Sequence, residues 1–125
     1  SSALVMRQAG KSVLILEKTE FVGGTTAKSG GVMWIPANRF MREDGENDSV
    51  EAAMTYLDSL QELDGGDAPG TSSEKRRAYL TEAPKAVDFL IDQGVKLRRG
   101  PTFWPDYYDE LPGGCKTSRT VVAEP

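Results

Sequence analysis

The sequence has no histidine and only one cysteine, Cys115. Without histidine these residues cannot form a Ser-His-Asp triad, a Cys-His pair or a His/Cys zinc site, so three common kinds of catalytic or metal centre are excluded. A single cysteine cannot form an internal disulfide, which fits a reducing compartment. We therefore expect a cytoplasmic protein that holds no metal.

Long apolar runs are also missing. No stretch approaches the roughly 20 residues that cross a bilayer, and the first residues lack the pattern of a signal peptide. The 15 basic and 19 acidic residues give a net charge of −4, and the length of 125 residues suits one domain. We therefore expect neither nucleic acid nor a membrane as the main partner.

The most informative stretch begins with four apolar residues, Val13 to Leu16, between Gly10 and Glu17. A short unbroken apolar run of this kind is typical of a strand buried on both faces of a parallel sheet, and it predicts an α/β fold. Ligands of such sheets bind beyond the carboxyl ends of the strands. Glu17 stands at that end, where its carboxylate can accept two hydrogen bonds from a vicinal diol such as a ribose.

A glycine-rich segment with several hydroxyls follows this acid. Glycine lets the backbone approach a bulky anion, and a run of free N–H groups can surround a phosphate. By themselves the glycines favour a solvated turn, but the strand, the acid and the Gly-Gly-Thr-Thr together favour a nucleotide site. The candidate residues are Gly23, Gly24, Thr25, Thr26, Ser29, Gly30 and Gly31.

The same residues carry a family resemblance. LEKTEFVGGTTAKSGG resembles the second half of the FAD fingerprint in the fumarate reductase and 3-ketosteroid dehydrogenase flavoprotein superfamily. The resemblance implies that FAD is the cofactor and that Glu17 binds the adenosine ribose, with Lys18 beside it. It also implies that 23–26 and 29–31 line the pyrophosphate and approach the flavin.

Ser1 to Ala9 is expected to be a helix that Gly10 ends in a left-handed conformation. By the resemblance this is the tail of the first Rossmann helix, and the G-x-G-x-x-G turn expected just before it is absent. We therefore expect a partial Rossmann-like FAD-binding domain, truncated at its N-terminus, whose partner is the remainder of the flavoprotein. Because half of the phosphate cradle would be missing, the isolated chain is expected to bind FAD weakly or not at all.

The middle of the chain is predicted to be a helical segment inserted in that domain. Residues 38–47 indicate a loop with an exposed helical turn. Asp48 and Glu51 have the spacing of a capping box, and apolar residues at helical spacing predict a helix from there to about Leu63.

A second helical region follows a break at 64–70. Thr71 and Glu74 repeat the capping-box spacing and predict a helix to about Glu82. Pro84 is expected to begin a separate helix, because proline is tolerated in a first turn. Extended segments are expected at 30–35, 95–97 and 119–123. The chain would then divide into a dinucleotide-binding part (1–37), a mainly helical part (38–99) and an aromatic loop with a terminal strand (100–125).

Residues 100–114, GPTFWPDYYDELPGG, place four aromatic residues among three prolines. Prolines stiffen a loop, so this one can hold aromatic side chains against a flat apolar ligand, or cover the end of the sheet. FWPDYY resembles the W-P-D-Y-(F/Y) loop of 3-ketosteroid Δ1-dehydrogenases. The resemblance implies that Tyr107 is a catalytic residue beside the flavin, where it assists another tyrosine in removing a proton from a steroid substrate.

Two classes of function follow from these patterns. The first is a fragment of an FAD-dependent oxidoreductase that acts on a CH–CH group next to a carbonyl. Its substrate would be a 3-ketosteroid or, as the alternative, a fumarate-like dicarboxylate. The second is a non-enzymatic α/β interaction module whose glycine-rich loop is only structural. Flavin absorbance of the intact gene product would separate the two.

Overall fold

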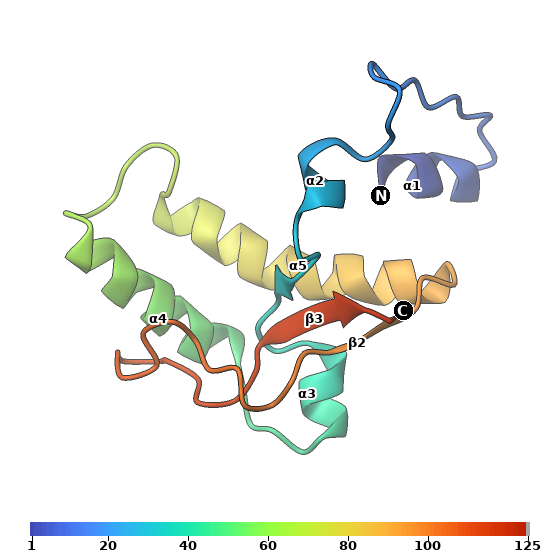
Figure 1. The fold of residues 1–125 in the computed structure, drawn as a ribbon. Coiled ribbons are helices and arrows are strands. Elements are labelled where there is room, and N and C mark those ends of the chain that lie inside the picture. Colours follow the sequence, from blue (N-terminus) through green and yellow to red (C-terminus); the bar gives the residue numbers. More distant parts are fainter. Residues whose placement is uncertain (125) are drawn as a thin grey trace.

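The computed structural model describes residues 1–124, so Pro125, at the end of the third predicted part, lies outside the described residues. Figure 1 shows a small sheet against α5, with α3 and α4 beside it and α1 and α2 set apart on the N-terminal segment. The helices are α1 (Ser2–Gln8), α2 (Gly24–Lys28), α3 (Arg39–Glu43), α4 (Val50–Leu63) and α5 (Ser73–Asp92), and the strands are β1 (Met33–Trp34), β2 (Leu97–Arg99) and β3 (Thr120–Ala123).

The sheet has three antiparallel strands in the order β1-β3-β2. On β3, Val121 pairs with Met33 of one neighbour and with Arg99 of the other. Val121 is completely buried and packs with Ile35 and with Val87 of α5. The sheet thus holds the segment that follows the glycine-rich loop against the last described strand, and burial of this apolar cluster on α5 stabilises the arrangement.

The predicted buried strand at Val13 to Leu16 is wrong for this structure. These residues belong to no strand, and Leu14, Ile15 and Leu16 are 82%, 77% and 84% exposed. The physical reason is that a strand needs hydrogen-bonded neighbours for its backbone, and within residues 1–124 no strand lies beside this run. A mixture of helices and sheet is confirmed, but the described strands are antiparallel rather than parallel.

Helix α4 starts close to the predicted position, with a different cap. The N–H of Ala52 donates a hydrogen bond of 3.0 Å to Oγ of Ser49, so Ser49 is the cap and the prediction of Asp48 is wrong. Both residue types cap helices well, which is why the sequence did not separate them. Behind this cap, Ala53 is completely buried and packs against Leu80 of α5.

Helix α5 is one continuous helix, so the predicted break before Pro84 is wrong. Proline inside a helix removes one hydrogen bond and crowds the preceding turn. Here the helix continues because Leu80 and Val87, on either side of Pro84, are both buried in separate apolar clusters. Thr71 does not cap this helix; Ser72 stands at the cap position and accepts no side-chain hydrogen bond.

Several local predictions are confirmed. Helix α1 is followed by Gly10 at φ +73°, and the helical turn expected within 38–47 is α3. Asn38 caps α3. The expected extended segments at 30–35 and 119–123 contain β1 and β3, while β2 starts at the last residue of the expected segment 95–97 and continues to Arg99. In the described part of the chain, none of the helices combines the length and the apolar character needed to cross a membrane.

Candidate functional site

Glu17 lies in an exposed turn directly after the apolar run. Its carboxylate accepts a hydrogen bond of 3.0 Å from the N–H of Thr19. Hydrogen bonds from the backbone N–H groups of Thr19 and Lys18 lower the pKa of Glu17 below its ordinary value. The residue is therefore an ionised, solvent-accessible acceptor, which is the chemistry that a pair of ribose hydroxyls requires. Lys18 is exposed beside it.

The glycine-rich segment forms a turn and the short helix α2. Gly23 has φ +103°, and a Cβ there would lie 2.6 Å from the Cβ of Ala27, so this turn requires glycine. The space around Gly24 and Gly31 is open. The N–H groups of Gly24, Thr25 and Thr26 are the first of a helix, where no intrahelical acceptor exists. The donors and the room therefore fit a diphosphate.

The hydroxyl of Ser29 is used within the loop. It donates a hydrogen bond of 2.8 Å to the carbonyl of Thr26 and accepts one of 3.1 Å from the N–H of Gly31. Its proton is therefore already engaged, and Ser29 shapes the turn that leads through Gly30 into β1. The structure thus brings Glu17 and the glycine-rich residues onto one exposed stretch of chain.

Tyr107 lies elsewhere in the molecule. Its side chain is 98% exposed, and the loop that carries it, orange to red in Figure 1, lies apart from α2. The structure therefore does not bring Tyr107 together with Glu17 and the glycine-rich segment. A hollow of about 490 Å³ between α4 and α5 is lined by none of the predicted site residues.

A buried ionic cluster lies under the Tyr107 loop. Arg119, only 2% exposed, pairs with Asp48 at 2.7 Å and with Asp106 at 2.7 Å. Burial acts to lower the pKa of Arg119, but hydrogen bonding to Asp48 and the charges of both carboxylates raise it above its ordinary value. The guanidinium therefore stays charged and joins the start of α4 to the loop.

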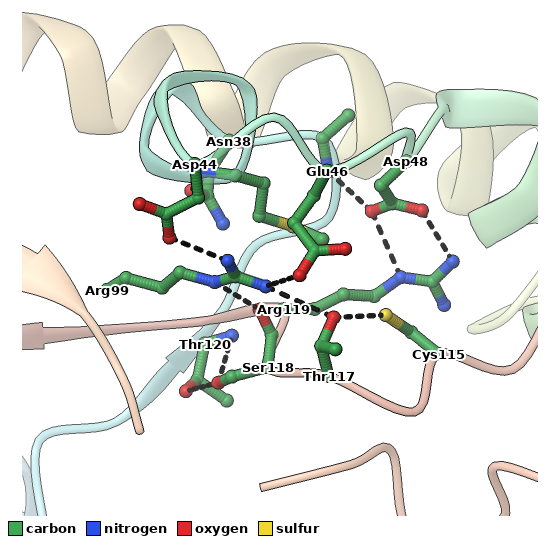
Figure 2. Close-up of polar contacts among 12 residues, drawn as sticks. Asn38, Asp44, Glu46, Asp48, Arg99, Cys115, Thr117, Ser118, Arg119 and Thr120 are labelled. Carbon is green, nitrogen blue, oxygen red and sulfur yellow. Dashed lines mark hydrogen bonds and ion pairs between the residues drawn. The ribbon is translucent and has the colours of Figure 1, made fainter. Parts of the chain in front are cut away.

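A second arginine, Arg99, forms ion pairs and hydrogen bonds beside this buried cluster. Figure 2 shows Arg99 and Arg119 lying side by side between acidic residues and the backbone of the last loop. Arg99 bonds Asp44 at 2.7 Å, Glu46 at 3.3 Å and the carbonyl of Ser118 at 2.9 Å. The two arginines therefore tie the chain between α3 and α4 to the segment that leads into β3.

Sequence reasoning missed both arginines. Arg119 stands 71 positions from Asp48, and Arg99 stands 55 positions from Asp44. Pairs so distant leave no spacing pattern. The one local signal was Asp106, an acid between a proline and two aromatic residues, which suggests a carboxylate with a structural task in a stiff loop.

Comparison of the sequence with known protein families identifies the family of this chain. The model of the FAD binding domain family matches residues 1–123, and the chain belongs to this family of flavin-binding proteins. The chain is 36% identical over 125 residues to a 3-oxosteroid 1-dehydrogenase of Mycolicibacterium smegmatis, covering 99% of this chain and 21% of that protein. It is also 36% identical over 129 residues to a 4-oxocyclohexanecarboxylate 2-dehydrogenase of Sinomonas cyclohexanicum, covering 99% of this chain and 21% of that protein.

A solved structure is similar as well. The crystal structure of a 3-ketosteroid Δ1-dehydrogenase from Sterolibacterium denitrificans, in complex with 1,4-androstadiene-3,17-dione, superposes with a TM-score of 0.76. The two chains are 36% identical, and the match covers 96% of this chain and 20% of that one. The chain therefore spans about a fifth of the length of the relatives it matches. The predicted superfamily and cofactor are confirmed.

Proposed function

We propose that this chain is part of an FAD-dependent oxidoreductase that removes hydrogen from a CH–CH group next to the carbonyl of a 3-ketosteroid. The observation that carries the proposal is the family match over residues 1–123, which includes both the Glu17 segment and the Tyr107 loop. The similarity of 36% to a 3-oxosteroid 1-dehydrogenase and to a steroid-bound structure supports this substrate class. A cytoplasmic location is part of the proposal.

Residues 1–37 form the dinucleotide-binding part in this proposal. The ionised, exposed carboxylate of Glu17 accepts hydrogen bonds from the hydroxyls of the adenosine ribose, and Lys18 lies beside it. The N–H groups of 23–26 and the turn at 29–31 surround the diphosphate. In the complete protein, we propose that the exposed apolar run before Glu17 becomes part of a Rossmann-like sheet, while 38–99 and 100–125 form the helical part and the aromatic loop.

Tyr107 is proposed as the catalytic residue of the chain. FAD, when bound, supplies the acceptor for the hydride that leaves the substrate carbon. In this proposal a second tyrosine outside this chain takes the proton from the neighbouring carbon as its phenolate, and the hydroxyl of Tyr107 donates a hydrogen bond that stabilises this phenolate. Its exposure of 98% supports this role, because the side chain is committed to no contact within residues 1–124.

A second substrate class has its own support. The similarity to a 4-oxocyclohexanecarboxylate 2-dehydrogenase favours a small cyclic keto acid, which offers the same CH–CH group beside a ketone. Such a substrate would also need a cation for its carboxylate, and a steroid would not. Steady-state turnover of both substrates by the complete protein, followed by bleaching of an artificial electron acceptor, decides between them.

The cofactor assignment is tested by titrating FAD into the apo form of the complete protein in a calorimeter. Replacing Glu17 with Gln removes a charged acceptor while keeping its shape, and we expect FAD affinity to fall by roughly tenfold or more. Glu20→Gln is the matched control, since Glu20 is exposed in the same turn region. Equal affinities for Glu17→Gln and Glu20→Gln would remove Glu17 from the site.

The catalytic assignment is tested with Tyr107→Phe against Tyr108→Phe in the complete protein. Loss of a positioned acid or base typically costs about 100-fold or more in rate. We expect kcat to fall by that factor for Tyr107→Phe and to change little for Tyr108→Phe. An unchanged kcat for Tyr107→Phe would exclude this residue from the chemistry.

A further inference from the structure

We propose that the hydrogen bond from the indole of Trp34 to the carboxylate of Asp106 positions Tyr107 for the reaction. Trp34 and Asp106 are positioning residues in this proposal, because neither reaches the reacting atoms. The inference rests on the proposed role of Tyr107. It assigns a task to two residues that lie 72 positions apart in the sequence and meet only in the folded chain.

Asp106 is a buried anchor. It is 6% exposed, and Oδ2 accepts hydrogen bonds of 2.7 Å from Nη1 of Arg119 and 3.0 Å from the N–H of Cys115. Oδ1 accepts one hydrogen bond, of 2.7 Å, from Nε1 of Trp34. Removing the indole N–H would therefore leave a buried carboxylate oxygen without a partner, and the side chain would turn to find one.

The backbone is held on both sides of Tyr107, whose own side chain stays free. The N–H of Asp106 donates to the carbonyl of Cys115 at 2.9 Å. The N–H of Tyr108 donates to the hydroxyl of Tyr56 at 3.3 Å. Holding both neighbours fixes the backbone of Tyr107 and the direction of its Cα–Cβ bond, from which the exposed phenol projects.

Trp34 is itself held firmly. Its ring is stacked on Tyr79, with the ring centres 6.5 Å apart, and its carbonyl accepts a hydrogen bond of 2.5 Å from the Tyr79 hydroxyl. The guanidinium of Arg119 lies 5.8 Å from the centre of the ring. Trp34 also ends β1, which begins two positions after Gly31, the last residue of the proposed diphosphate loop.

Trp34 therefore connects two parts of the proposed active site. One side of it continues into the chain that would hold the cofactor, and the other side holds the residue next to Tyr107. Displacing a reacting group by about 1 Å can cost on the order of 100-fold in rate. The direct hydrogen bond between Trp34 and Asp106 limits how far the backbone that carries Tyr107 can shift relative to the chain that follows Gly31.

The test uses the complete holoenzyme with Trp34→Phe, which keeps an aromatic ring and removes the N–H. A second variant replaces Trp34 with benzothienylalanine, in which sulfur takes the place of the indole N–H and the ring keeps its size. Tyr79→Phe is the matched control, since it removes the hydrogen bond to the Trp34 carbonyl, keeps the ring that stacks on the indole, and leaves the bond to Asp106 untouched. FAD content and thermal midpoint are measured for every variant.

We expect both Trp34 variants to lower kcat and the rate of flavin reduction in a single turnover by about 10- to 100-fold, with KM and FAD affinity changed less than about threefold. Tyr79→Phe is expected to keep kcat within about threefold. A kcat retained by the benzothienylalanine variant, or lost equally in Tyr79→Phe, would overturn the proposal.

The variants are also made in the Tyr107→Phe background. If Trp34 acts through Tyr107, its replacement should lower kcat no further there. An additional loss of the same factor would show that Trp34 acts by another route and would refute the inference. A normal kcat for Tyr107→Phe itself would instead remove the proposed function of Tyr107, so the two failures are distinguishable.

Discussion

Arg119 and Asp48 form a bidentate ion pair in the interior of the protein. Nη2 of the arginine lies 2.7 Å from Oδ1, and Nε lies 3.1 Å from Oδ2. Both side chains are almost completely buried, at 2% and 6% exposure. Because a second carboxylate, that of Asp106, shares the same guanidinium, loss of the arginine would leave two buried negative charges close together.

We therefore predict that Arg119→Met destabilises the protein by about 3–5 kcal/mol, the range found when one partner of a buried pair is removed. Arg77→Met is the control, since Arg77 is 3.8 Å from Glu51 at an exposed site and its removal should cost less than about 1 kcal/mol. The measurement is urea-induced unfolding. Similar midpoints for the two variants would show that the buried cluster contributes little.

Gly113 should not tolerate a side chain. Its φ is +77°, and a Cβ there would overlap the carbonyl oxygen of Ala52 and lie 2.6 Å from the N of Tyr56. Gly45 has nearly the same φ, +76°, with open space around it. We predict that Gly45→Ala costs about 1 kcal/mol of stability through backbone strain. Gly113→Ala should cost at least about 2 kcal/mol more, because the loop must move away from α4.

That comparison also has a functional readout. Because Gly113 lets the loop that carries Tyr107 approach α4, its replacement should lower kcat as well as the thermal midpoint. Gly45→Ala should lower the midpoint alone. If the two alanine variants lose the same stability, the close approach at Gly113 is not what holds the loop.

The buried Asn38 is predicted to contribute more than a cap. It is completely buried, accepts a hydrogen bond of 3.1 Å from the N–H of Met41 and donates one of 2.7 Å to the carbonyl of Ile35. Asn38→Ala leaves two buried groups without partners, so we expect a loss of about 2–4 kcal/mol. Ser49→Ala removes only the cap of α4 and should cost about 1 kcal/mol. Thermal unfolding of both variants checks that Asn38→Ala loses more stability than Ser49→Ala.

Alkaline pH should destabilise the fold through Tyr56. Burial, opposed in part by the hydrogen bond from Tyr108, raises the pKa of Tyr56 above its ordinary value of 10.0. The unfolded chain then loses this proton first, so the stabilisation is fully present below about pH 10 and is lost as the pH rises through the folded pKa. The free energy of unfolding should fall above pH 10, and less steeply in Tyr56→Phe. If the free energy of unfolding fell equally with pH in Tyr56→Phe and in the unsubstituted protein, Tyr56 would not be the group responsible.

Local structure followed from local sequence. Helix α1 with Gly10 after it, α4 over most of its length and the short strands near 95–97 and 119–123 were all predicted, because caps, breaks and apolar spacing act over a few residues. The two segments for which a specific resemblance exists, at Glu17 to Gly31 and at Trp104 to Tyr108, also identified the family that the comparisons confirmed.

What the sequence alone determined is therefore the helices α1, α3 and α4, the cofactor and the family, all of which rest on residues close together in the chain. Only the tertiary structure decided which strands pair, that Pro84 sits inside a continuous helix, and that Arg119 and Trp34 hold Asp106. The reason is that each of these features is stabilised by residues dozens of positions away in the chain. This holds for the sheet, the buried ion pair and the helix that continues through a proline, and no local sequence pattern specifies such distant partners.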